Sequence, residues 1–469
     1  MNRCLTFTVV GIAAIFCSCS LAPQYNRPQA PVPDAWPQGV AYSDVQSTPD
    51  TPAARRLAWK DFFTDKHLQK LIEMALAGNR DLRLAALNVE RARALYGIQR
   101  AELLPSVAAS GDWMKQRRSA DLIAPGYPRT VEQYSVNLGI AAWEIDFFGR
   151  IRSLKDQALQ TYLATEQARK SAQIMLIAEV ARNYLMLAAD RENLALAQAT
   201  FEAQQSSFNL VQRQYETGFA TQLDLTQAQS RVEAARGDIP RFTQLVAKDK
   251  NALELLTGAP VPQELLPADL DSISPPREIA AGLPSETLLN RPDIIAAENR
   301  LKGAYAFIGA ARASFFPRIS LTTSIGTASD ELSGLFNAGT GTWSFAPQIS
   351  MPIFDARTWA ALRVSKTDRE IVLTQYEKAI QTAFRDVADT LAVQGTINQQ
   401  LSAQQSLVTA VAETYRLAGK RYTMGLDSYL VVLDAQRSLY AQQQVLISLK
   451  MTRLANQVRL YAVLGGGAE

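Results

Sequence analysis

The side chains best placed to interact with one another lie near the start of the last helical segment. Leu430, Asp434 and Arg437 are spaced i, i+4 and i+7, so all three share one helical face. Tyr422 lies just before a glycine turn, and Asp224 occupies the comparable region earlier in the chain. Two interpretations stay open: an ordinary Asp–Arg pair on a solvated face, or a latch. In a latch, charges at a hairpin tip pair with a neighbouring helix or chain and hold the tip closed.

Histidine and cysteine, which commonly carry catalysis, are almost missing, and the many carboxylates belong to no catalytic motif. The sequence has one histidine, His67, and three cysteines, Cys4, Cys17 and Cys19. A single histidine cannot build a histidine metal cluster, we expect no catalytic triad or thiolate site, and no glycine-rich phosphate loop follows a strand pattern. We therefore expect no enzymatic activity and no cofactor apart from a covalent lipid. The net charge of +3 also excludes a basic patch of the strength that nucleic acids require.

Long helical segments must position the charged residues. No proline occurs between Pro128 and Pro240 or after Pro352, and apolar residues follow steps of three and four. A helix from Arg152 to Thr217 would be roughly 100 Å long at about 1.5 Å per residue. Such a length indicates a coiled coil or a similar helical array; a fibrous scaffold is the alternative. The apolar positions are Ile177, Val180, Tyr184, Leu187, Leu225, Ala228, Val232, Ala235, Ile380, Phe384, Val387 and Leu391.

Ahead of each long helix the hydrophobic period changes to two. Apolar and polar residues alternate in 134–142, 318–325 and 342–353, with Ala142 on the apolar face of the first window. This pattern is typical of transmembrane β-strands, although a sheet with one solvated face gives the same pattern. Four strands are too few to close a barrel, since the smallest have about eight. Open strand edges are not tolerated in lipid, so strands that span a membrane would require oligomerisation. Tryptophans in or beside these windows favour the membrane: Trp113, Trp143 and Trp343.

The same plan occurs twice, about 210 residues apart, which is too long for a solenoid and indicates a duplicated unit. The first repeat spans 57–258 and the second 285–466, joined by a linker, 259–284, and followed by a short tail, 467–469. The strands and helical-hairpin turns are expected near 104–118, 130–146 and Gly218 in the first repeat and near 316–327, 341–354 and Gly425 in the second.

The N-terminus has the composition of an export signal. A positively charged start precedes a 13-residue apolar run, Leu5–Cys17, which is too short to span a bilayer. We expect residues 1–18 to be a signal peptide and Cys19 to become the lipidated first residue of an extended segment, 19–56. An ordinary signal peptide with incidental cysteines is the alternative.

On these residues the chain resembles the TolC/OprM family of outer-membrane efflux proteins, especially its lipoprotein branch in resistance-nodulation-division systems. The resemblance covers essentially the whole chain. Phe16 departs from it, because leucine is usual at that position of the lipidation motif. The matching segments are Cys19–Tyr25, Asn290–Ile294, Phe315–Pro317, the Tyr-x-x-Gly motifs at 215 and 422, Leu433–Leu439 and Leu460–Gly466.

The resemblance implies a mixed α/β membrane protein that assembles as a homotrimer. Each chain would give four strands to a 12-stranded transmembrane β-barrel, continuous with a long periplasmic α-helical barrel and a mixed equatorial domain. By matching positions, Tyr422, Leu430, Asp434 and Arg437 would form the periplasmic gate. Asp224 would be their partner from the first repeat.

The implied function is passive conduction. The protein would be the outer-membrane exit duct of a tripartite multidrug efflux pump in a Gram-negative bacterium, anchored by lipid, palmitate included, on Cys19. A periplasmic adaptor and an inner-membrane proton-driven pump would dock on the hairpin tips and open them. Two alternatives stay open: a type I protein-secretion duct, and a non-conducting coiled-coil lipoprotein that tethers the membrane.

Overall fold

The computed structural model describes residues 20–42, 54, 57–280 and 288–467. The expected signal peptide, 1–18, and the expected lipidation site, Cys19, lie outside the described residues. Within them the chain divides into two compact units. The first contains residues 88–165 and 296–376 together with the N-terminal segment to residue 29, and the second contains 30–87, 166–295 and 377–469. Each unit therefore combines segments from both halves of the sequence.

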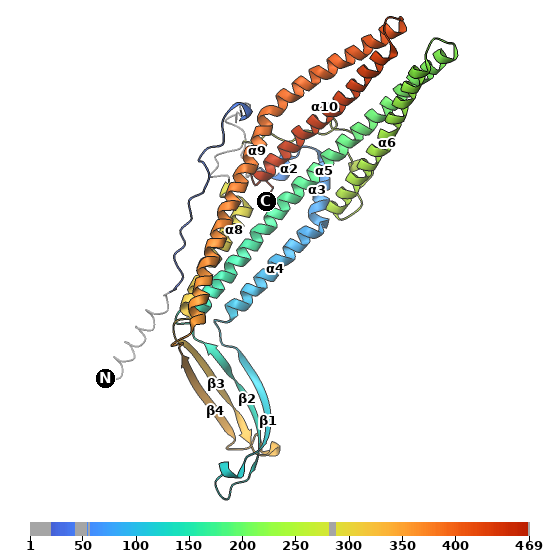
Figure 1. Ribbon diagram of the computed structural model, residues 1–469. Coiled ribbons are helices and arrows are strands. Elements are labelled where there is room, and N and C mark those ends of the chain that lie inside the picture. Colours follow the sequence, from blue (N-terminus) through green and yellow to red (C-terminus); the bar gives the residue numbers. More distant parts are fainter. Residues whose placement is uncertain (1–19, 43–53, 55–56, 281–287, 468–469) are drawn as a thin grey trace. The chain divides into compact units, whose positions relative to one another are not determined.

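The described chain consists of long helices and one sheet (Figure 1). The helices are α2 Trp59–Phe62, α3 Lys66–Gly78, α4 Arg80–Ala101, α5 Arg150–Glu216, α6 Gln222–Thr257, α8 Pro292–Ala313, α9 Ala356–Thr423 and α10 Tyr429–Val463. The strands are β1 Val107–Arg117, β2 Thr130–Glu144, β3 Arg318–Ser329 and β4 Gly341–Ser350. Short 3₁₀ turns are η1 Val40–Tyr42, η3 Ala120–Leu122, η4 Gln263–Leu265 and η5 Leu332–Gly334.

The order helix, strand, strand, helix, helix occurs twice with closely matched lengths. Helices α4 and α8 have 22 residues each, and α5 and α9 have 67 and 68. Helices α6 and α10 have 36 and 35 residues. Among the described residues, no helix combines the length and the apolar composition needed to cross a membrane.

The first unit contains a four-stranded antiparallel sheet in the order β1-β2-β3-β4, so β1 and β4 are its edges (Figure 1). One row of the sheet aligns Ala109, Leu138, Ile325 and Trp343. Because side chains alternate along a strand, these residues share one apolar face. Leu138, Ile325 and Trp343 are each more than half exposed, so the described chain leaves this apolar face uncovered.

The alternation along β2 is reset by a β-bulge between Ile140 and Trp143. Ala142 has a left-handed φ of 53° at this point. Trp143 then pairs with Leu321 and joins the apolar face, whereas Glu144 pairs with Ser320 on the polar face. The expected place of Ala142 on the apolar face was therefore wrong, because a bulge inserts an unpaired residue that strict period-two counting cannot detect.

The second unit is built around two helical hairpins, α5–α6 and α9–α10 (Figure 1). Of the residues predicted from the helical period, Phe384 is partly exposed and stacks on Trp36, at 5.0 Å between ring centroids. Leu225 is partly buried against a core cluster. The remaining ten are buried: Ile177, Val180, Tyr184, Leu187, Ala228, Val232, Ala235, Ile380, Val387 and Leu391.

Two local features of the helices depend on single residues. A break separates α2 from α3 after Phe62, because Phe63 is extended and the Asp65 carboxylate accepts a hydrogen bond from the Leu68 amide, which starts α3. Helix α6 continues through Pro240. Proline removes one helical hydrogen bond there, and we attribute the tolerance to packing along this helix.

Candidate functional site

The tip of the α9–α10 hairpin, residues 424–428, is a tight glycine turn. Gly425 has a φ of 75°, which L-residues with side chains rarely adopt. The Gly425 amide donates to the Tyr422 carbonyl at 2.9 Å, and the Leu426 amide donates to the Arg421 carbonyl at 2.9 Å. Arg421 also spans the turn, and its Nε and Nη2 donate to the two Asp427 carboxylate oxygens at 2.6 and 2.9 Å. This two-point geometry fixes the direction in which α10 starts.

The tip of the α5–α6 hairpin, residues 217–221, is closed differently. Gly218 has a φ of 81°. Thr221 and Asp224 form a capping box: the Thr221 hydroxyl accepts from the Asp224 amide, and the Asp224 carboxylate accepts from the Thr221 amide at 2.9 Å. Asp224 therefore has a structural role at the start of α6, which stabilises the helix end.

Tyr422 joins the two hairpins within one chain. Its hydroxyl donates to the Gln214 side-chain oxygen of α5 at 2.6 Å. Its ring lies 5.2 Å from the ring of Tyr429, at the first position of α10. Burial, together with the nearby charge of Asp224, raises the pKa of the Tyr422 phenol, so the hydroxyl stays protonated and remains a donor.

A hydrophobic cluster beneath both tips supports Tyr422. Its partly buried contributors include Tyr422 and Leu225. Because the cluster takes residues from all four hairpin helices, its packing couples the two tips in the isolated chain. Its buried members are Val211, Ala228, Ala418, Tyr429, Val432, Leu433 and Ala435.

Leu430, Asp434 and Arg437 lie on the exposed side of α10. Asp434 and Arg437 form an i,i+3 ion pair at 3.4 Å with side chains 54% and 66% exposed. Leu430 is 49% exposed and is absent from the cluster below the tips. Among the described residues, no hydrogen bond or ion pair joins Asp434 or Arg437 to Tyr422 or Asp224. The single chain thus brings Tyr422 and Asp224 together, while the other three residues face outward.

Sequence reasoning missed the residues that hold the tips in place. Gln214 immediately precedes the Tyr-x-x-Gly motif of the first repeat, and Arg421 and Asp427 flank the second. Opposite charges on either side of a glycine turn were the available signal for the Arg421–Asp427 pair. The Tyr422–Gln214 contact joins residues 208 positions apart and had no local signal.

A buried and a partly buried carboxyl group face each other farther along the α5–α6 hairpin. Asp249 of α6 is 7% exposed, and its Oδ2 has no hydrogen-bond partner among the described atoms. Burial and the adjacent Asp190 of α5 raise the pKa of Asp249 to about 7, although Arg182 opposes the shift. This pair is therefore a titratable contact between the two helices near neutral pH.

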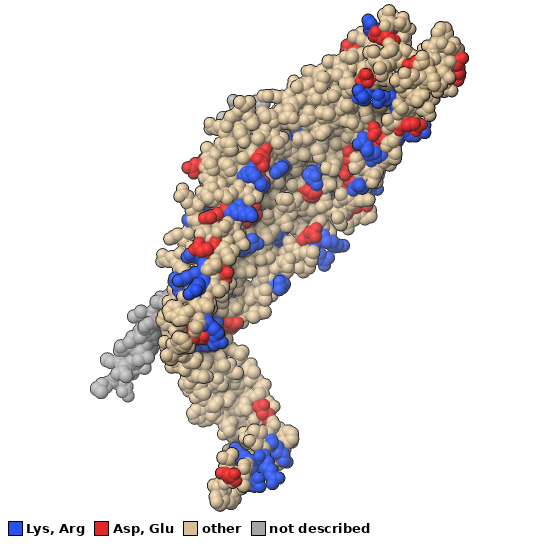
Figure 2. Space-filling view, in the orientation of Figure 1, with Lys and Arg blue, Asp and Glu red and all other residues tan. Residues whose placement is uncertain are grey.

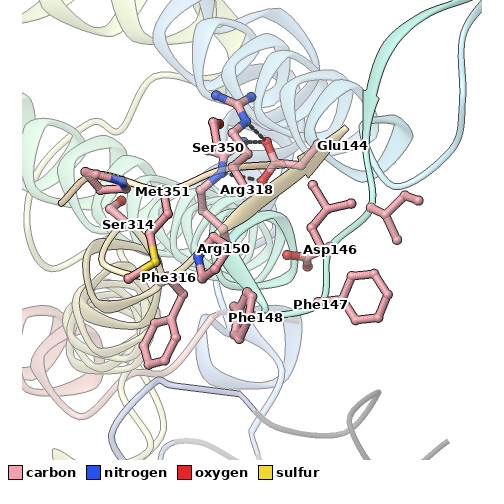
Figure 3. A pocket seen from close by; sticks show the side chains of 15 residues that line it. Glu144, Asp146, Phe147, Phe148, Arg150, Ser314, Phe316, Arg318, Ser350 and Met351 are labelled. Atoms are coloured by element: carbon pink, nitrogen blue, oxygen red, sulfur yellow. Dashed lines mark hydrogen bonds and ion pairs between the residues drawn. The ribbon is translucent and has the colours of Figure 1, made fainter. Parts of the chain in front are cut away.

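A cavity of about 440 Å³ lies where the strands of the first unit meet its helices (Figure 3). Glu144 accepts two hydrogen bonds from Arg150, both at 2.8 Å, and also pairs with Arg318. Phe148 and Phe316 stack at 4.8 Å between ring centroids. Glu144 and Arg318 are on the polar face of the sheet, because Glu144 pairs in register with Ser320. The cluster therefore fixes the strand-to-helix connections by charge pairing and aromatic packing.

A sheet with two open edges and a bare apolar face, connected to long helical hairpins, defines a class of protein built partly for a membrane. The family model described as outer membrane efflux protein matches residues 71–259 and 283–466. The chain therefore belongs to the outer membrane efflux protein family, as its resemblance to TolC/OprM proteins predicted. This is a family of transport proteins rather than enzymes, and the protein is located in the outer membrane of a Gram-negative bacterium.

Individual proteins agree with the family assignment. The probable efflux pump outer membrane protein TtgC of Pseudomonas putida is 48% identical over 459 residues, covering 97% of this chain and 94% of the relative. A crystal structure of a membrane protein from Pseudomonas aeruginosa has a TM-score of 0.88 and 41% identity, covering 95% of this chain and 100% of that one. The open state of the MtrE outer membrane channel of Neisseria gonorrhoeae has a TM-score of 0.85 and 38% identity, covering 96% of this chain and 99% of that one.

Proposed function

We propose that the protein is the exit channel of a tripartite multidrug efflux pump and works as a homotrimer. Three copies of the four-stranded sheet would close a 12-stranded transmembrane barrel. The long hairpins of the three chains would form a helical barrel in the periplasm, with the shorter elements as an equatorial domain. The relatives are named as outer membrane proteins of efflux pumps for toluene, antibiotics and solvents, which supports efflux of small molecules.

The observation that carries this proposal is the unfinished sheet. Every residue of β1 and of β4 is exposed. In hydrocarbon an unpaired strand edge leaves backbone groups without hydrogen bonds, each at a loss of several kcal/mol. Pairing β1 of one copy with β4 of the next removes all edges at once. The uncovered apolar face, with Trp343 80% exposed, would then contact lipid.

The matched order and lengths of the elements support an internal duplication. Each repeat then supplies one strand hairpin and one helical hairpin, so three chains give six of each. A ring of six helical hairpins is wide enough to leave a lumen instead of a dry core. Two repeats in one chain also allow the two hairpin tips to differ. The α5–α6 tip has the capping box at Asp224, whereas the α9–α10 tip has the Arg421–Asp427 pair.

The proposed mechanism is gated passive conduction. Asp434, Arg437 and Leu430 would meet their counterparts from the other chains around the axis, while Tyr422 and Asp224 position the tips. A periplasmic adaptor and an inner-membrane proton-driven pump would dock there and shift the tips to an open arrangement. A ring of three Asp434 side chains would favour cations over anions.

We further propose that lipid on Cys19 anchors the mature chain. Residues 20–39, which follow, contain no helix or strand and are held near their start by charge: Arg27 donates to Glu298 of α8 at 2.6 and 3.2 Å, and the Tyr25 hydroxyl donates to the same carboxylate at 3.1 Å. Mass spectrometry of the mature N-terminus tests the anchor. A diacylglyceryl, N-acylated Cys19 is expected, and an unmodified N-terminal residue would contradict it.

Closure of the barrel can be tested by cross-linking the sheet edges. Ser110 of β1 and Thr342 of β4 lie in the same row across the sheet and therefore on the same face. The variant carrying both Ser110→Cys and Thr342→Cys should give covalent trimers with a flexible bismaleimide, since β1 and β4 of different copies become neighbours. The two variants in which only Ser110 or only Thr342 is replaced by cysteine, both of which keep Cys19, are the controls and should not form covalent trimers. Folded double variant without covalent oligomers would refute the arrangement.

A further inference from the structure

The loop end of the β1–β2 hairpin carries a cluster of positive charge. Figure 2 shows lysine and arginine gathered at this end, whereas the middle of the visible face of the sheet carries almost no charge. We call Lys115, Arg117, Arg118 and Arg129 the basic cluster; all four are exposed. The equivalent end of the β3–β4 hairpin has no lysine or arginine between residues 327 and 342. The cluster is therefore specific to the first hairpin and is not a general property of the strand ends.

The strand register orders the side chains along one face. Trp113 pairs with Tyr134, Lys115 with Glu132, and Arg117 with Thr130. Because alternate residues point the same way, Trp113, Lys115 and Arg117 share the apolar face. The rings of Trp113 and Tyr134 stack at 6.4 Å between centroids. Moving outward, the face changes from aromatic rings to an ion pair and then to arginine, over roughly 13 Å.

Among the described residues, only the innermost cation of the basic cluster, Lys115, has an acidic partner. Glu132 accepts from Lys115 at 2.8 Å, from the Trp113 indole at 3.0 Å and from the Tyr134 hydroxyl at 2.8 Å. In the described part of the chain, no carboxylate pairs with Arg117, Arg118 or Arg129.

The loop itself does little to neutralise the outer arginines. The Arg118 amide donates to the Arg129 carbonyl at 2.8 Å, which sets both residues at the base of the loop. Asp121 in η3 is the one acidic residue between them in sequence. Leu122 and Tyr127 of the same loop are 80% and 72% exposed, so apolar surface lies in the same short loop as the cationic groups.

We propose that the basic cluster binds the phosphate-bearing headgroup of a lipid in the outer leaflet of the membrane. The inference rests on the proposed function, which places the apolar face in lipid and the hairpin loops outside. Aromatic rings prefer the interfacial depth of a membrane. Guanidinium groups a few ångströms farther out then lie at the level of lipid phosphates, which arginine binds through two parallel hydrogen bonds. Lipid phosphate would supply the negatively charged partner that the described part of the chain does not give these three arginines.

The test compares binding of diphosphorylated lipid A to purified trimers in neutral detergent, with bound lipid counted by native mass spectrometry. The variant Arg117→Gln/Arg118→Gln/Arg129→Gln should bind more weakly, by roughly fivefold for each arginine removed, the factor that corresponds to about 1 kcal/mol per basic residue near an anionic membrane. The matched control is Arg83→Gln/Arg91→Gln/Arg93→Gln, which removes three exposed arginines of α4 and should bind like the wild type. Lipid A from which both phosphates have been removed should bind equally to the wild type and to the loop variant.

Three results would overturn the inference. The first is unchanged lipid A affinity in the loop variant, and the second is an equal loss in the α4 control. The third is dissociation of the loop-variant trimer in lipid-free detergent. This result would show that the arginines contact Asp330 or Glu331 of a second copy. Planar-bilayer conductance separates this test from the proposed function. If the wild type and the loop variant both conduct and bind lipid A equally, only the lipid site is wrong. Absence of conductance in both would refute the channel itself.

Discussion

At the residue scale, the structure separates two roles that the sequence had grouped together. Tyr422 is held within its own chain by Gln214 and Tyr429, and Asp224 is used as a helix cap. Within the described residues, Asp434 and Arg437 form an ion pair with each other and with no other residue. An exposed pair of this kind contributes at most about 0.5 kcal/mol to folding. The pair lies in the second and third turns of α10, below the tip, and its small effect on folding is consistent with the proposed contacts between chains.

This distinction predicts the behaviour of a double variant. Asp434→Ala/Arg437→Ala should leave the thermal unfolding temperature almost unchanged and make cells more sensitive to a large antibiotic that normally enters poorly. The reason is that contacts between chains at the closed tip are lost while folding contacts remain.

The control for this variant is Glu413→Ala/Arg416→Ala, which removes a comparable exposed i,i+3 pair on α9. Equal antibiotic uptake by wild type and by the Asp434/Arg437 variant would show that this pair is an ordinary surface pair. Increased uptake in the control as well would point to general loosening of the hairpin instead of a latch.

Among the helices and strands, the hydrophobic period predicted the elements in which apolar residues recur at a regular spacing. Helices α5 and α9 lie inside the proline-free windows, α5 begins and ends within two residues of the expected Arg152–Thr217, and their apolar steps are mostly buried. The strands lie in or beside the windows of period two. Strand β4 ends at Ser350, earlier than residue 354, because Pro352 cannot donate to a sheet ladder.

What could not be predicted depends on contacts distant in sequence or on single-residue geometry. The bulge at Ala142 and the break before Asp65 each arise from one residue's backbone conformation. The Tyr422–Gln214 bond and the Glu144 cluster require the fold before their partners can be known. For the gate, the sequence gives residue types and helix face, whereas the chain-to-chain contacts that would make it a gate belong to the assembly.

The contact between buried Asp249 and partly buried Asp190 predicts a pH-dependent stability of the α5–α6 hairpin. Asp249 has a raised pKa of about 7 when folded and an ordinary one of about 3.9 when unfolded. The folded state thus binds more protons between these values, so the free energy of unfolding should fall as the pH rises from about 4 to about 7.

Asp249→Asn should flatten this dependence and raise the melting temperature at pH 8, because the buried negative charge is gone. Melting curves at pH 5 and pH 8 measure the effect. Glu233→Gln, at a half-exposed position of the same helix, serves as the control and should keep the wild-type slope. A wild-type slope in Asp249→Asn would show that other groups cause the pH dependence.

For the molecule as a whole, a single chain leaves several of its surfaces without a partner among the described residues. Its sheet has two free edges, its apolar face is uncovered, and the ion pair on α10 faces outward. Family membership supplies the setting in which these features become complementary, namely an outer-membrane efflux protein. The proposed trimer pairs the edges, immerses the apolar face in lipid and turns the exposed tip residues toward one another. The same arrangement places the basic cluster at the level of lipid headgroups.

Planar-bilayer recording of the purified, lipid-reconstituted protein tests whether the trimer is a gated channel. We predict discrete single-channel steps, brief and small in the wild type because the tips are mostly closed, with a preference for cations over anions. The Asp434→Ala/Arg437→Ala variant should give larger and longer steps under the same conditions. Trimeric protein that inserts into the bilayer and passes no current in either form would contradict the account and favour a structural tether.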